Sequence, residues 1–292
     1  MKKILQQSGK ALGYFLFYFV VGQLIFSVII QIIMGIYAGT AAREAGVVLA
    51  TQEDAQSYGM EFYAANMGID LALRAILTLL CFLIFFLIRK KHFTEEISLQ
   101  KTTGIKMISA LFGAVFVIFF VNGMLNFLIP QDELSSFQEA SSVLYAYPLW
   151  QALLANAFLV PILEEVVFRG LMFSRLQKAL PNIATALITS LLFGLVHGQL
   201  VWMLFAFVVG LLLSYVRIKT GSILPTIVMH IMINLYATLS SYQIIVISNM
   251  SLYVVLVVIG ALCIIPCVFL MHKACQEEDR LQAKVEVSTV VM

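Results

Sequence analysis

Residues 149–175 read LWQALLANAFLVPILEEVVFRGLMFSR, a hydrophobic stretch that is interrupted by two adjacent carboxylates, Glu164 and Glu165, and by Arg169. The stretch is long enough to cross a bilayer as a helix, which takes about 20 mainly apolar residues. A charged side chain at the bilayer centre costs about 2.5–3.5 kcal/mol on insertion scales, so a sequence keeps such groups where something offsets the cost. We therefore expect a membrane helix whose charged residues have a functional role.

Hydrophobic runs of this kind recur along the whole chain. Of its 292 residues, 61% are hydrophobic and only 12% are charged, and the mean hydropathy is +0.97, which excludes a soluble domain. A bilayer admits only helices or closed barrels, and barrel strands would show alternating rather than continuous hydrophobicity. The fold class is predicted to be all-α, in a polytopic membrane protein with no nucleic-acid partner.

The runs predict a bundle of eight transmembrane helices. The predicted spans are 11–37, 71–88, 107–129, 149–175, 182–198, 200–218, 222–240 and 251–271. The first run is too long for the core of a signal peptide, so we interpret it as a retained helix. One membrane domain is expected over residues 1–271, followed by a polar cytoplasmic tail at 272–292.

The distribution of basic residues predicts the orientation of these spans, since cytoplasmic loops carry an excess of Lys and Arg. With a cytoplasmic N-terminus, the outer segments contain Arg43 as their only basic residue. The inner segments contain Lys2, Lys3, Lys10, Arg89, Lys90, Lys91, Lys101, Lys106, Arg175, Lys178, Arg217, Lys219, Lys273, Arg280 and Lys284. Both termini are therefore predicted to be cytoplasmic, in a multi-pass protein of the plasma membrane.

The fourth and fifth spans should form a hairpin that turns near Pro181. Glu164 lies 17 residues before this proline and His197 lies 16 residues after it. At a rise of about 1.5 Å per residue, both are about 24 Å along their helices from the turn. Equal distance from the turn of an antiparallel hairpin means equal depth, so Glu164 and His197 can meet near the middle of the membrane.

The seventh span contributes a second histidine. His230 and Asn234 are four residues apart and therefore share one face of a helix. An imidazole and a carboxamide on one face can donate hydrogen bonds to the same oxygen, which is what a developing oxyanion requires. A purely structural role, as interhelical hydrogen-bonding groups, is the alternative interpretation for both residues and for His197.

The two adjacent glutamates are expected to differ in role. Glu165 and Arg169 are four apart on the helix and well placed to form an ion pair. Glu164 is rotated by about 100° and should point elsewhere. A carboxylate without a partner in a low-dielectric site is suited to proton transfer near neutral pH, so Glu164 is the candidate general base.

Three short motifs together resemble a known family. They are Glu-Glu-x-x-x-Arg at 164–169, Phe-x-x-x-His at 193–197 and His-x-x-x-Asn at 230–234, each on a predicted membrane helix. This set is similar to the motifs of the CAAX-protease and bacteriocin-processing family, also called Abi or type II CAAX prenyl endopeptidases. The resemblance covers about 149–240 and implies an eight-helix intramembrane endopeptidase, in which Glu165 and Arg169 hold the site together.

The resemblance also implies roles for the other motif residues. Glu164 would activate the attacking water, with His197 helping to position and deprotonate it. His230 and Asn234 would stabilise the oxyanion. The implied substrate is a membrane-embedded or lipid-modified peptide or protein, and the implied location is a bacterial plasma membrane.

Three alternatives remain open at this stage. Glu164, His197 and His230 could together supply a zinc site of the His₂Glu type, although no metal cofactor is favoured. The chain could be a catalytically silent protein that binds a peptide or a partner. Intramembrane Glu, His and Arg are also used by proton-coupled transporters, although no internal repeat supports that function here.

Overall fold

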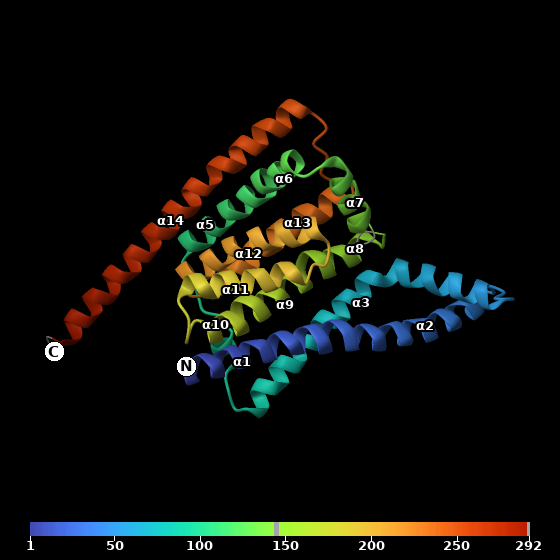
Figure 1. The fold of residues 1–292 in the computed structure, drawn as a ribbon, viewed down its shortest axis with the longest axis horizontal. Coiled ribbons are helices and arrows are strands. Elements are labelled where there is room, and N and C mark those ends of the chain that lie inside the picture. The colour runs from blue at the N-terminus through green and yellow to red at the C-terminus, as the bar shows by residue number, and fades with distance from the viewer. Residues whose placement is uncertain (143–145, 291–292) are drawn as a thin grey trace.

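The computed structural model describes residues 1–142 and 146–290, and this part of the chain is built of helices without strands (Figure 1). The prediction of an all-α membrane protein is confirmed. The first elements are α1 (Lys2–Leu16), η1 (Phe17–Ile25), α2 (Phe26–Glu44), α3 (Gln52–Ile88), α4 (Phe93–Glu96), α5 (Gly104–Val115), η2 (Phe116–Val121), α6 (Asn122–Leu128) and α7 (Gln131–Ser142).

The later elements are α8 (Leu149–Ala152), η4 (Leu153–Leu159), α9 (Val160–Glu165), η5 (Val166–Met172), α10 (Phe173–Leu176), α11 (Asn182–Leu195), α12 (Leu200–Thr220), α13 (Leu224–Ser241) and α14 (Met250–Val290). The η segments are π-helical stretches that continue directly into the α-helices beside them. The polar segment predicted as a tail continues α14 without a break as far as Val290.

Within the described residues, seven helices are long and apolar enough to cross a membrane. They cover Lys2–Glu44, Gln52–Ile88, Gly104–Met124, Leu149–Leu176, Leu200–Thr220, Leu224–Ser241 and Met250–Glu277. The remaining apolar helix, α11, has 14 residues and so reaches about 21 Å, less than the hydrocarbon thickness of about 30 Å. The count of eight crossings therefore stays a prediction.

The fifth predicted span, 182–198, is longer than the helix that forms there. α11 ends at Leu195, and Gly198 adopts a φ of 76°, a left-handed conformation that suits glycine and ends a helix. α12 begins at once, because the side chain of Gln199 accepts a hydrogen bond from the backbone N–H of Trp202. His197 therefore lies in a tight turn between α11 and α12 rather than inside a helix.

The helices are arranged so that the segment with the two glutamates lies at the centre (Figure 1). η5 contacts α1 and α11, and α9 and η4 contact α13 and α3. On the far side of α13, α5 separates it from α14. Both chain ends lie toward the left of Figure 1, while the side of the membrane that they face stays a prediction.

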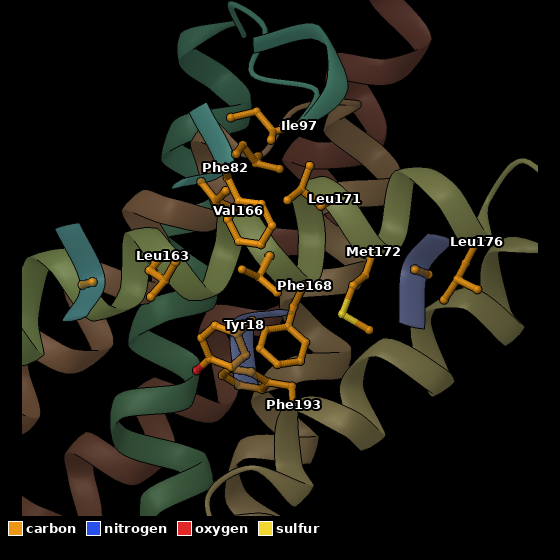
Figure 2. Close-up of a cluster of buried hydrophobic side chains, with 14 of the residues drawn as sticks. Tyr18, Phe82, Ile97, Leu163, Val166, Phe168, Leu171, Met172, Leu176 and Phe193 are labelled. Atoms are coloured by element: carbon orange, nitrogen blue, oxygen red, sulfur yellow. The ribbon is translucent and has the colours of Figure 1, made fainter. Parts of the chain in front are cut away.

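Residues from α1 to α12 pack a buried cluster around this central segment (Figure 2). Ile97 packs against Gly170, where a Cβ would lie 2.9 Å from the Cβ of Ile97. On the opposite side, the rings of Tyr18, Phe168 and Phe193 lie together. In a membrane such contacts stabilise mainly through close packing, because lipid tails are as apolar as the side chains.

Candidate active site

The predicted ion pair between Glu165 and Arg169 forms at the junction of α9 and η5. Nη1 of Arg169 donates to Oε1 of Glu165 over 2.8 Å, and both side chains have no exposed surface. Burying two charges carries a large desolvation penalty, which only close geometry and further hydrogen bonds can offset. The pair is therefore a fixed structural element of the fold.

α12 supplies part of that offset. Nη2 of Arg169 donates to the carbonyl oxygen of Gly210 over 3.2 Å, and its guanidinium carbon lies 4.4 Å from the centre of the Phe193 ring. A Cβ at Gly210 would lie 3.1 Å from the same Nη2. A cation over an aromatic face is stabilised by the ring quadrupole, most strongly where water is excluded. Gly210 and Phe193 thus determine the position of Arg169.

A second arginine fixes the backbone of the same segment. Arg217, on α12, is 4% exposed, and its Nε donates to the carbonyl oxygen of Arg169 over 3.2 Å. Its guanidinium carbon also lies 5.6 Å from the centre of the Phe173 ring. A basic residue near the end of a membrane helix is expected in the interface, so this buried contact could not be predicted from the sequence.

His230 brings the two glutamates together. Its Nδ1 lies 3.0 Å from Oε1 of Glu165, and its Nε2 lies 3.7 Å from Oε2 of Glu164. A carboxylate oxygen only accepts, so the hydrogen between His230 and Glu165 is on Nδ1. The separation from Glu164 is too long for a direct hydrogen bond. His230 is held by one glutamate and faces the other.

Glu164 differs from its neighbour in the way that the sequence predicted. It is 7% exposed, and no arginine or lysine of the described chain pairs with it, whereas Glu165 contacts both Arg169 and His230. One carboxylate is thus neutralised by a fixed cation, while the other has only the more distant histidine. The structure brings Glu164, Glu165, Arg169 and His230 into one cluster.

His197 lies beside this cluster without direct contact to a described glutamate. Its Nδ1 is 2.7 Å from the carbonyl oxygen of Phe193, so the hydrogen is on Nδ1 and Nε2 is left as the acceptor of a neutral ring. The ring of Phe193 contacts both histidines, with centroids 5.0 Å from His197 and 5.8 Å from His230. One aromatic side chain therefore contacts both histidines, whereas no ion pair within 4.0 Å joins Glu164 and His197 in the described part of the chain.

Asn234 lies one helical turn from His230, as predicted, but its amide is engaged. Its Nδ2 donates to the backbone carbonyl oxygen of Asn156 over 2.9 Å. The side chain of Asn156 in turn donates to the Tyr147 hydroxyl over 2.8 Å. An NH₂ group carries two hydrogens, so Asn234 keeps a second donor for another acceptor.

Tyr18 was not predicted as a member of the site. It comes from η1, is buried against the Phe168 ring with centroids 5.6 Å apart, and is within electrostatic range of Glu164 and Arg74. Arg74 itself pairs with Asp70 at 2.8 Å. The only sequence signal was a hydroxyl within a run of aromatic residues in an apolar helix, which packing alone would also explain.

The zinc alternative requires three ligands to converge on one point. Among the described residues, no group of three or more His, Cys, Asp or Glu side chains is arranged to hold a metal ion. Glu164 and His230 are neighbours, with Oε2 of Glu164 3.7 Å from Nε2 of His230, while Nδ1 of His197 is held by the carbonyl oxygen of Phe193. The three residues of the His₂Glu set are therefore not gathered around one point in this arrangement, and the absence of a metal cofactor stays a prediction.

Comparison with known proteins supports the interpretation of the motifs. Residues 146–236 match the family model described as type II CAAX prenyl endopeptidase Rce1-like. A Bacillus subtilis protein described as "Putative membrane peptidase YdiL" is 28% identical over 106 residues, which cover 36% of this chain and 43% of that protein. The match thus spans less than half of that relative.

A second relative is similar over more of its length. The UPF0177 protein YxdF of Lactococcus lactis is 26% identical over 165 residues, which cover 55% of this chain and 90% of that protein. No solved structure matches the chain. The chain is a multi-pass membrane protein with bacterial relatives, and its segment 146–236, which contains all three motifs, is Rce1-like and confirms the resemblance to the type II CAAX prenyl endopeptidases.

Proposed function

We propose that this protein is an intramembrane endopeptidase that hydrolyses a peptide bond with water activated by Glu164. The observation that carries the proposal is the inequality of the two adjacent carboxylates. Glu165 is held by Arg169 and His230, while Glu164 faces Nε2 of His230 at 3.7 Å. A water molecule can contact two polar atoms at such a separation, so it could reach both groups at once.

In the proposed reaction, Glu164 accepts a proton from this water as its oxygen attacks the peptide carbonyl carbon. The carbonyl oxygen becomes an oxyanion, and its C–N bond breaks when the leaving nitrogen takes the proton from Glu164. General base catalysis of this kind contributes about 10²–10⁴-fold to a rate. Glu165 is already paired with Arg169, so it does not take part in the proton transfer.

The proposed oxyanion donors are His230 and Asn234. Glu165 accepts the Nδ1 hydrogen of His230, so the ring donates to the oxyanion through Nε2, beside Glu164, when both of its nitrogens carry a hydrogen. Asn234 contributes the amide hydrogen that Asn156 does not use. Donors that are already oriented stabilise developing charge without having to reorganise during the reaction. His197, with Nε2 as acceptor, is proposed to help hold the water.

The proposed substrate is a membrane-embedded or lipid-modified peptide. Glu164 is buried among helices whose outer surfaces are apolar, so a substrate would approach through lipid rather than from water. A peptide could reach the glutamate only if neighbouring helices separate. The bacterial relative described as a membrane peptidase is consistent with this class of substrate.

The test is a cleavage assay on the full chain in liposomes. A pool of membrane-anchored and lipid-modified peptides is incubated with wild type or with Glu164→Gln, and products are identified by mass spectrometry. Cleavage by wild type alone is expected. Equal cleavage by both proteins would refute the role of Glu164. Cleavage by neither, with full complementation of a deletion strain by Glu164→Gln, would favour a protein that binds a partner without hydrolysis.

A further inference from the structure

A cavity of about 350 Å³ lies between α1–η1 and α3, away from the glutamates. It is lined by Lys10, Gly13, Tyr14, Phe17, Cys81, Phe82, Phe85, Phe86, Arg89, Lys91 and Arg175. This volume is at the lower end of the range of small-molecule sites, which is about 300–1,000 Å³. Nothing in the proposed hydrolysis uses it.

The walls of this cavity are aromatic and come from one face of each helix. Tyr14 packs on Phe82 and Phe86 with centroids 6.1 and 6.0 Å apart, and Phe17 packs on Phe82 at 5.0 Å. The first helix contributes residues spaced by three and four positions, and so does α3, so both faces run along the helix axes. The interior of the cavity therefore accepts an apolar chain.

Cations gather at one end of these faces. Lys10 precedes Tyr14 by one turn, and Arg89 follows Phe85 by one turn, with its guanidinium carbon 5.9 Å from the ring centre. Both side chains are exposed, and neither forms an ion pair with a described residue. A cavity with an apolar interior and cationic side chains at one end is complementary to an amphiphile that carries an anionic head group.

The two remaining cations share a single carboxylate. Glu96 pairs with Lys91 at 2.8 Å and also with Arg175. The cavity is thus lined by four cationic side chains, of which only two pair with Glu96, and this leaves an excess of positive charge. This end of the bundle contains the N-terminal lysines and is predicted to be cytoplasmic, where the leaflet is rich in anionic lipid.

We propose that this cavity is a binding site for an anionic phospholipid of the cytoplasmic leaflet. One acyl chain lies along the aromatic wall, and the phosphate contacts Lys10 and Arg89. Because α1 also packs on η5 and α10, the bound lipid would hold the first helix against the segment that bears the glutamates. The proposal is independent of hydrolysis, so it holds or fails separately from the endopeptidase function.

Binding is measured by native mass spectrometry of the full chain in detergent, titrated with phosphatidylglycerol or phosphatidylcholine. Each basic residue near a membrane surface contributes about fivefold to affinity for anionic lipid. The double substitution Lys10→Gln/Arg89→Gln is expected to weaken the tightest phosphatidylglycerol site about 25-fold. The control Lys101→Gln/Lys273→Gln removes the same charge from exposed residues outside the cavity and should change it less than threefold.

A pair of glycines on α1 tests the cavity without changing charge. A Cβ would meet nothing within 4 Å at either Gly9 or Gly13, but only Gly13 lines the cavity. Gly13→Leu should weaken phosphatidylglycerol binding at least tenfold, whereas Gly9→Leu should leave it unchanged. A phosphatidylglycerol carrying a photoreactive acyl chain should crosslink to residues 10–17 and 81–91 in wild type.

Two results would overturn the proposal. One is binding of phosphatidylcholine as tight as that of phosphatidylglycerol, which would show that the basic residues do not select the head group. The other is crosslinking that is unchanged in Gly13→Leu, which would place the lipid elsewhere on the surface.

Discussion

Glu164 and Glu165 are adjacent in sequence, yet we predict that neutralising Glu165 lowers stability, whereas neutralising Glu164 lowers activity and leaves stability nearly unchanged. Glu165→Gln leaves the charge of Arg169 buried without its carboxylate partner. Removing one member of a buried pair typically lowers the free energy of unfolding by about 3–5 kcal/mol. At about 2–4 °C per kcal/mol for a larger protein, the expected fall in Tm is about 6–20 °C.

Glu164→Gln should behave differently, because no described lysine or arginine depends on Glu164. Its expected change in stability is under about 1 kcal/mol, or less than about 2–4 °C in Tm. Thermal unfolding of both variants in the same detergent, followed by tryptophan fluorescence, measures the difference. Adding Arg169→Met to Glu165→Gln should recover part of the loss by removing the stranded charge. Equal Tm values for the two single variants would refute this assignment of roles.

Three further predictions concern the surroundings of the site. Gly194→Ala should lower the free energy of unfolding by about 1–3 kcal/mol, because the new Cβ would lie 2.7 Å from the carbonyl oxygen of Met203. The control Gly35→Ala, whose Cβ would meet nothing within 4 Å, should cause no loss of stability in a thermal melt. Burial alone would raise the pKa of Glu96, but hydrogen bonds and charges from its lysine and arginine partners hold it below the ordinary value. The stability that Glu96 contributes is therefore present above a pH of about 4.3 and is lost as pH falls through the lowered pKa. The difference in Tm between wild type and Glu96→Gln should be large at neutral pH and should disappear in acid. Incubation with a zinc chelator should leave the rate of peptide cleavage unchanged, and loss of cleavage that zinc restores would contradict the metal-free reaction.

Local spacing in the sequence was sufficient to predict the contacts that depend on one helix. The pairing of Glu165 with Arg169, and the separate direction of Glu164, follow from a four-residue interval. The ion pair forms although Arg169 lies in the π-helical stretch η5, which could not be predicted from the sequence. Gly194 allows a close approach to the backbone of Met203, which lies on α12. The catalytic roles themselves stay predictions.

Contacts between helices that are far apart along the chain could not be predicted from the sequence. The ring of Phe193 contacts both His197 and His230, and His197 lies in the turn that follows α11, where Gly198 is left-handed. The burial of Arg217 depends on how α12 packs, since hydropathy places the same residue at the membrane edge. Depth along a hairpin constrains only the axial position of two residues, because it contains no information on rotation about the helix axis.

Glu164 is proposed to be the general base of peptide hydrolysis. The decisive measurement is the single-turnover cleavage rate of wild type and of Glu164→Gln, on one substrate and in one lipid, with both proteins shown to be folded. The rate of Glu164→Gln should be at least 10²-fold lower than that of wild type, in the range of a lost general base. A rate within tenfold of wild type would contradict this role.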